Sequence, residues 1–177
     1  MKRFQFILLY RLGERYFLKR KGFRKINLSN LTLSDLFFDD LDMEGAHLQN
    51  SCFRKACFSK VSLKQADLSQ GDFSDASIRH SDLTQANLSQ IQLEQSDLVF
   101  CQLTQANLQY ADLSRTFFID VVLDQADLQH SNLVGAVLCN SSLHQVNLFG
   151  AKLNKVRFKG IVFQLVILAK PDLGDID

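Results

Sequence analysis

A period of five residues constrains the fold of this chain more than any other feature. Large apolar residues recur at every fifth position from Leu28 to Phe163, which makes 28 positions occupied by 19 Leu, 7 Phe, 1 Met and 1 Ile. Five residues advance an α-helix by about 140° beyond one full turn, and along a straight strand they reverse the face. Neither element keeps these side chains on one side. We therefore expect a chain that bends once every five residues and winds into a stacked solenoid.

A longer period of twenty residues indicates how many sides each coil has. The segment Leu-x-Gln-Ala-(Asp/Asn)-Leu occurs at 63–68, 83–88, 103–108 and 123–128, and a fifth copy at 143–148 has Val146 in place of the alanine. Twenty residues contain four bends, which predicts a four-sided coil and about seven coils in all. Coils stacked about 4.8 Å apart would align like side chains, including a ladder of glutamines at Gln65, Gln85, Gln105, Gln125 and Gln145.

The segments 66–70 (ADLSQ) and 86–90 (ANLSQ) resemble the pentapeptide-repeat family, whose motif is A-(D/N)-L-x-x. The resemblance covers about residues 26–163 and implies an all-β fold, a right-handed quadrilateral parallel β-helix. It also implies that the central Leu or Phe fills the interior, that the small residue two positions earlier packs inward, and that the remaining positions face solvent. We therefore expect a cap segment at 1–25, the β-helix at 26–163, and a cap or dimerisation tail at 164–177.

The first 25 residues combine apolar side chains with nine Lys or Arg against a single acid, Glu14. Their apolar positions spread around a helical wheel, so they do not form a clean amphipathic helix. We expect a cap over the open end of the first coil, because terminal repeats need a different outer face. The alternative is contact with a membrane surface or a nucleic acid. The basic residues that would make this contact are Lys2, Arg3, Arg11, Arg15, Lys19, Arg20 and Lys21.

An apolar segment follows the last repeat. An uncovered end of a β-helix is an open edge that invites pairing with another chain, so this segment is expected to cap the end or to form a seam between two copies. A homodimer is also what the resemblance implies, since the gyrase-protecting members of the family pair through their C-terminal ends. The candidate residues are Leu165, Val166, Ile167 and Leu168.

The sequence carries no recognisable catalytic or cofactor-binding motif, and we expect neither an enzyme nor a metal site. The four cysteines form no CxxC pair and no zinc spacing, which favours structural thiols in a reducing compartment. No apolar run is long enough to span a membrane, and the first ten residues lack the cleavage site of a signal peptide. These features lead us to expect a cytoplasmic protein.

One side of the predicted coil carries an unusual set of outward apolar residues on three adjacent coils. A contiguous apolar cluster on a surface usually marks an interaction site. The alternative is that a local bulge, or the N-terminal segment, covers the cluster. The residues are Val99, Phe100, Phe117, Ile119, Val137 and Cys139.

Three functions compete at this level. The first is a non-enzymatic scaffold that presents this cluster to a protein partner. The second, implied by resemblance to quinolone-resistance members of the family, is a DNA mimic that binds a type II topoisomerase such as DNA gyrase. Residues 65–145 support it with ten acids against Arg79 and Arg115, whereas the overall charge of +1 and the basic residues between 152 and 159 oppose it. The third is membrane or nucleic-acid association through residues 2–25.

Overall fold

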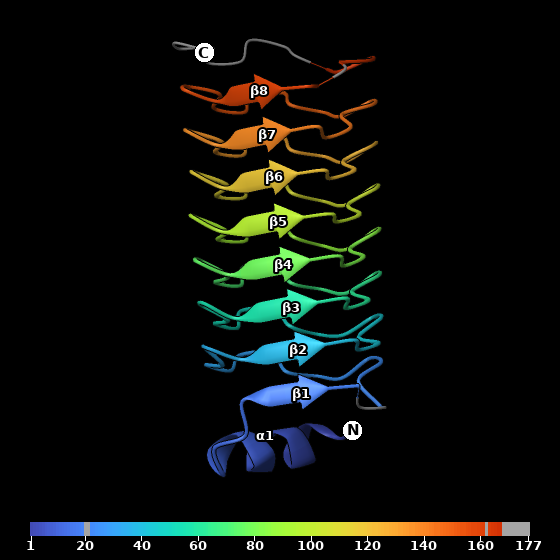
Figure 1. Ribbon diagram of the computed structural model, residues 1–177, viewed down its shortest axis with the longest axis vertical. Coiled ribbons are helices and arrows are strands. Elements are labelled where there is room, and N and C mark those ends of the chain that lie inside the picture. The colour runs from blue at the N-terminus through green and yellow to red at the C-terminus, as the bar shows by residue number, and fades with distance from the viewer. Residues whose placement is uncertain (20–21, 162, 168–177) are drawn as a thin grey trace.

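The computed structural model describes residues 1–19, 22–161 and 163–167. Within them the chain forms one helix, α1 (Arg3–Arg11), and eight strands that stack in sequence order as a single parallel sheet along the rod (Figure 1). The strands are β1 (Tyr16–Leu18), β2 (Phe37–Asp39), β3 (Cys57–Ser59), β4 (Ser77–Arg79), β5 (Asp97–Val99), β6 (Phe117–Ile119), β7 (Val137–Cys139) and β8 (Arg157–Lys159).

The other three sides of the coil are held together by single parallel bridges between residues twenty apart. Ser62 pairs with Asp82 on one side, Asp67 with Asn87 on the next, and residues 72 and 92 on the third. This arrangement confirms the predicted four-sided parallel β-solenoid of about seven turns. Among the described residues, the sheet side is the side where three consecutive residues pair regularly on each coil.

The apolar residues of the five-residue period fill the interior as predicted. Every one from Leu28 to Leu153 is buried. The last two differ from the prediction: Phe158 is only partly buried, and Phe163 is half exposed. Each interior side chain is covered on both sides by neighbouring coils, and the described residues contain no coil that follows Phe163.

The Asp or Asn of the repeat shapes the corners. Asp67 Oδ1 accepts a hydrogen bond from the Ser69 N–H at 3.1 Å, a local bond that favours a turn. The position two residues after each central Leu lies in the left-handed region, as at Gln85 (φ 58) and Gln105 (φ 59). The predicted glutamine ladder is confirmed at this corner: each side-chain amide donates to the next one along the rod, at 2.8–3.1 Å from Gln65 to Gln145.

The corner that follows the sheet side uses side chains to complete its hydrogen bonds. The Val61 N–H donates to Ser81 Oγ (3.1 Å), and this hydroxyl in turn donates to the Phe58 carbonyl (3.4 Å). One coil further on, Cys101 takes the place of the serine, and its thiol donates to the Ile78 carbonyl at 3.2 Å. The small inward side chains at positions 81 and 101 therefore form hydrogen bonds with buried backbone groups, in addition to fitting into the limited space at this corner.

The N-terminal segment begins the stack before the first repeat. α1 lies across the end of the rod (Figure 1), and β1 adds a strand that pairs Phe17 with Phe38. Phe6 of α1 is fully buried and stacks on Phe17 with 4.6 Å between ring centroids. The sequence pattern did not reveal β1, because Phe17 precedes Phe38 by 21 residues and so falls outside the register of five.

Candidate interaction surface

The apolar cluster expected from the sequence lies on the outer face of β5, β6 and β7, and we call it the mid-sheet patch. It consists of Val99, Phe100, Phe117, Ile119, Val137 and Cys139. The sheet register pairs Phe117 with Val137 in one column, and Ile119 with both Val99 and Cys139 in another. The rings of Phe100 and Phe117 are 51% and 43% exposed, while the other four side chains are half buried.

Regular pairing holds the mid-sheet patch in place. β6 pairs in register with β5 and β7, so no bulge interrupts the sheet here. α1 lies at the far end of the rod, beside β1 (Figure 1), and within the described residues the N-terminal segment does not cover the patch. Both alternatives that would hide these side chains are therefore unsupported by the described part of the chain.

Phe100 extends the patch around the corner of the coil. Its backbone lies in the left-handed region at φ 55, which is rare for a bulky side chain. Its ring stacks on the imidazole of His80 from the preceding coil, with 4.9 Å between centroids and 9° between planes. The ring is thereby held beside the edge of the sheet while the residue stays 51% exposed.

Charged residues border the mid-sheet patch along the rod axis. On the side toward the N-terminus, Arg79 forms an ion pair with Asp97 at 3.2 Å and also donates to Ser77 Oγ at 2.8 Å. On the other side, Arg157 and Lys159 of β8 are both exposed. An apolar centre with a charged rim is the usual composition of a protein-binding surface.

The same face of the sheet carries a second apolar cluster near α1, which the sequence analysis missed. The rings of Tyr16 and Phe37 stack with 4.8 Å between centroids, and Leu18 lies exposed on the same strand as Tyr16. Phe37 stands at an outward position of the repeat and could have been noticed. Tyr16 and Leu18 could not, because their placement requires the pairing of β1 with β2.

The structure divides the basic residues proposed for a membrane or nucleic-acid contact into two groups. Arg3 donates to Asn27 Oδ1 (2.6 Å) and to the Ser29 carbonyl (2.9 Å), and Arg15 lies over the ring of Tyr10 at 4.4 Å. These two guanidinium groups are turned toward the protein. The second group is exposed to solvent and consists of Lys2, Arg11 and Lys19. Arg20 and Lys21 lie outside the described residues.

The candidate residues for a C-terminal cap or dimer seam continue the stack for a few residues. Ile167 forms a parallel bridge with Asn147, and Val166 packs against the core. Leu165 and Ile167 are largely exposed. Leu168 lies outside the described residues, so the proposed seam remains a prediction.

In the described part of the chain, the titratable side chains concern two kinds of chemistry: metal binding by clusters and reaction at the thiols. No cluster of three or more His, Cys, Asp or Glu there could hold a metal ion. Burial raises the pKa of the Cys101 thiol to about 11, so this thiol stays protonated and unreactive. No described helix has both the length and the apolar composition needed to span a bilayer.

Half of the ten acids in residues 65–145 are neutralised by ion pairs. Arg54 contacts Asp72 and Asp75 at 3.4 and 3.3 Å. The remaining pairs are Lys64 with Asp82 (3.0 Å), Arg79 with Asp97 (3.2 Å) and Arg115 with Glu94 (3.6 Å). The acidic character of this section is therefore weaker in the folded chain than its sequence suggests.

Comparisons with known proteins agree with this fold. The family model for pentapeptide repeats matches residues 23–59, 56–95, 86–125 and 122–160. A pentapeptide repeat protein from the thylakoid lumen of Arabidopsis thaliana is 23% identical over 55% of this chain and 68% of its own, with a TM-score of 0.53. HetL, involved in heterocyst differentiation regulation in the cyanobacterium Nostoc, is 20% identical over 100% and 94%, with a TM-score of 0.48.

The structure of QnrB1, a plasmid-mediated fluoroquinolone resistance protein, is also similar, with 17% identity over 87% of this chain and 89% of its own and a TM-score of 0.35. No curated protein matches this chain in sequence. At these levels of identity the likeness to the solved structures concerns the fold alone.

Proposed function

This chain belongs to the pentapeptide-repeat family, and we propose that it acts as a non-enzymatic scaffold that binds a protein partner through the mid-sheet patch. The observation that carries this proposal is the set of five apolar side chains on three consecutive strands together with Phe100 at the adjoining corner, with two aromatic residues about half exposed. Contiguous apolar surface of this kind is uncommon on proteins that act alone.

The composition and the rigidity of the surface both favour a protein partner. Aromatic side chains with a charged rim are enriched where proteins meet, and they dominate the binding energy. The backbone beneath them is already paired on both sides in the sheet. Binding would therefore order few groups on this side of the interface, and less affinity would be lost to conformational entropy.

DNA mimicry directed at a type II topoisomerase is the weaker candidate. The net negative charge of residues 65–145 favours it. However, five of the ten acids are ion-paired, and the unpaired ones lie on several sides of the coil: Asp67 and Asp127 on one, Asp112 on another. A mimic of duplex DNA needs unpaired charges at regular spacing along one face.

The scaffold proposal is tested by affinity capture with two matched variants. Phe117→Asp places a charge in the mid-sheet patch, and Phe149→Asp places the same charge on another side of the rod. The two rings are equally exposed, at 43% each, so the substitutions should perturb folding to the same small extent. Circular dichroism and thermal melting establish that both variants keep the fold.

We expect a bound protein to be retained by the wild type and by Phe149→Asp, and to be lost with Phe117→Asp. The proposal fails if the partner is retained by both variants or lost from both. A parallel assay of DNA gyrase supercoiling, with and without a quinolone, tests the second candidate. Inhibition or protection that survives Phe117→Asp would replace the scaffold with DNA mimicry.

A further inference from the structure

The outer side of α1 carries an apolar stripe that faces away from the rod. Phe4 and Leu8 lie four residues apart and therefore on the same side of α1, and Leu12, the C-cap residue directly after the helix, continues this spacing. They are 75%, 46% and 76% exposed. Because α1 lies across the end of the stack (Figure 1), this stripe forms part of the end surface of the solenoid.

The opposite side of α1 is firmly anchored. Phe6 is completely buried in an aromatic cluster, with ring centroids 6.3 Å from those of both Phe23 and Phe38. Arg3 ties the first turn to the Asn27 side chain and to the Ser29 carbonyl. The apolar stripe is therefore presented in a fixed orientation and does not need to be ordered when a ligand binds.

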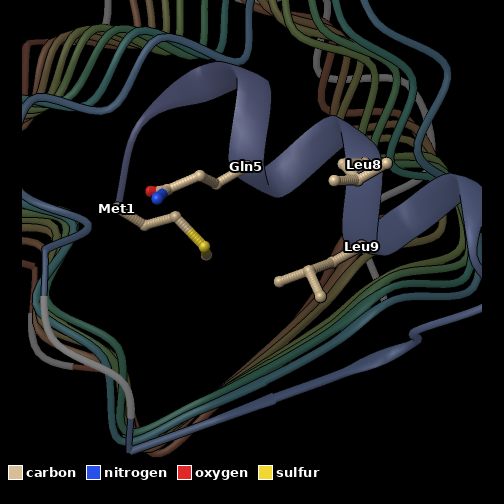
Figure 2. Close-up of a pocket in the computed structure, with 4 residues that line it drawn as sticks. All are labelled: Met1, Gln5, Leu8 and Leu9. Carbon is tan, nitrogen blue, oxygen red and sulfur yellow. The ribbon is translucent and has the colours of Figure 1, made fainter.

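A hollow adjoins this stripe. It has a volume of about 460 Å³ and is lined by Met1, Gln5, Leu8 and Leu9, three of which are apolar. Figure 2 shows the four side chains bordering the hollow beside α1. Leu8 belongs to both features, so the apolar surface continues from the stripe into a recess that can accept a hydrocarbon chain.

Three exposed basic residues belong to the same N-terminal segment as the stripe. Arg11 follows Phe4 by seven residues and borders the stripe on α1 itself, and Lys2 and Lys19 are also exposed. Among the described residues, none of these three side chains forms an ion pair. The end surface thus combines an apolar centre with cations at its edge.

An apolar stripe with exposed cations beside it fits one class of binding partner better than the others. A second copy of the chain would bring two basic ends together, and a nucleic acid would place its phosphates against exposed Phe and Leu side chains. An anionic lipid surface matches both features, since its head groups attract the cations and its acyl region accepts the stripe. We infer that α1 docks this end of the solenoid on an anionic bilayer, with the rod pointing away from the membrane. The inference is independent of the mid-sheet patch.

Tryptophan fluorescence can locate the contact, because the chain contains no tryptophan. Leu12→Trp places the probe in the stripe, and Phe149→Trp places a matched probe on the side of the rod. Both variants are mixed with vesicles of phosphatidylcholine alone and with vesicles that also contain phosphatidylserine. We expect a blue shift of the emission only for Leu12→Trp and only with phosphatidylserine. A shift for both probes, or for neither, would overturn the inference.

Co-sedimentation with the same vesicles measures the two contributions separately. Replacing Phe4 and Leu12 together by Ser should weaken binding roughly tenfold or more through lost apolar burial. Replacing Lys2 and Arg11 together by Ala should weaken it roughly tenfold at low salt and less at high salt.

Duplex DNA binding that resists the Ser substitutions would point to a nucleic acid instead. A dimer of the wild-type protein that these substitutions convert to a monomer would point to a second copy, and either result contradicts lipid docking.

Discussion

The ring of Phe100 lies nearly parallel to the imidazole of His80, with 4.9 Å between their centroids. The two residues occupy the same corner on successive coils, and both have left-handed backbone, at φ 55 and φ 50. A left-handed backbone costs a residue with a Cβ about 1–2 kcal/mol, and a stacked pair of rings recovers about 0.5–1.5 kcal/mol. The stacking therefore offsets part or all of this backbone cost, while Phe100 remains 51% exposed.

Replacing Phe100 by Asn tests this interpretation. Asn tolerates the left-handed region better than Phe does, so the relief of backbone strain should offset the lost stacking. We expect the free energy of unfolding, measured by chemical denaturation, to change by less than about 1 kcal/mol. The nearby Phe118 is fully buried. Phe118→Ala should therefore lower the free energy of unfolding by about 3–5 kcal/mol. Equal losses for the two variants would show that Phe100 is a structural residue.

Gly71 leaves room for the ring of Phe73. A Cβ at Gly71 would lie 2.8 Å from this ring, whereas the equivalent position two coils later holds Ala111 ahead of the smaller Leu113. We expect Gly71→Ala to lower the free energy of unfolding by about 1–3 kcal/mol through overpacking.

The same substitution should cost less in a Phe73→Leu background, because the contact with the ring is then relieved and only the 3.0 Å approach to the Leu68 carbonyl remains. A double-mutant cycle from denaturation curves measures this coupling. If Gly71→Ala costs the same in both backgrounds, the crowding comes from the backbone and the ring is not its cause.

The buried thiol of Cys101 should make stability depend on alkaline pH. Its pKa is raised from 9.0 to about 11 in the folded chain, because burial disfavours the thiolate. The unfolded chain therefore loses this proton at a lower pH than the folded chain. The contribution is fully present below pH 9 and is lost as pH rises toward 11, by on the order of 2 kcal/mol.

Cys101→Ser removes this titration while keeping a hydrogen-bond donor, as Ser81 and Ser141 do in the same column. The difference in unfolding free energy between wild type and variant should be constant up to about pH 9 and should then shift in favour of the variant. A difference that stays constant up to pH 11 would mean that the thiol ionises equally in both states.

Replacing two neighbouring glutamines of the ladder by glutamate should destabilise the fold by more than the two single replacements together. Gln105 accepts a hydrogen bond from Gln85 and donates one to Gln125, at 2.9 and 2.8 Å. Gln105→Glu breaks one of these exposed bonds and should cost about 1 kcal/mol or less. Adding Gln85→Glu places two carboxylates on adjacent coils about 4.8 Å apart. The double variant should therefore lose more than the sum of the single losses at low salt, and recover in high salt. Additive losses at low salt would contradict the stacked geometry.

Most of the solenoid could be predicted because its contacts follow the chain period. Each residue lies beside the one twenty positions later, so the repeat alone was enough to align Gln85 with Gln105, and to gather Val99, Ile119 and Cys139 on one side. The same reasoning placed Leu28 to Leu153 in the interior. It failed at Phe163, where the described residues contain no following coil to complete the burial.

The details of the corners needed the structure. The sequence pattern does not distinguish the corner after the sheet from the other three, and only the structure shows that Ser81 and Cys101 complete its hydrogen bonds. That position holds Asp, Lys, His, Asn and Gly on other coils, and several of these residues favour a left-handed backbone, but the bulky Phe100 does not, so its φ of 55 was learned only from the structure.

The five-residue period of apolar residues and the twenty-residue repeat were together sufficient to derive the four-sided coil, its interior and its outward columns, because every repeat packs against a near copy of itself. The packing at the N-terminal end does not follow this period. There Phe6 and Phe17 meet a coil on one side only, and the position of β1 and the exposure of Phe4, Leu8 and Leu12 depend on how non-repeating side chains fit together. That packing joins residues with no common spacing in the chain, so only the tertiary structure decides it.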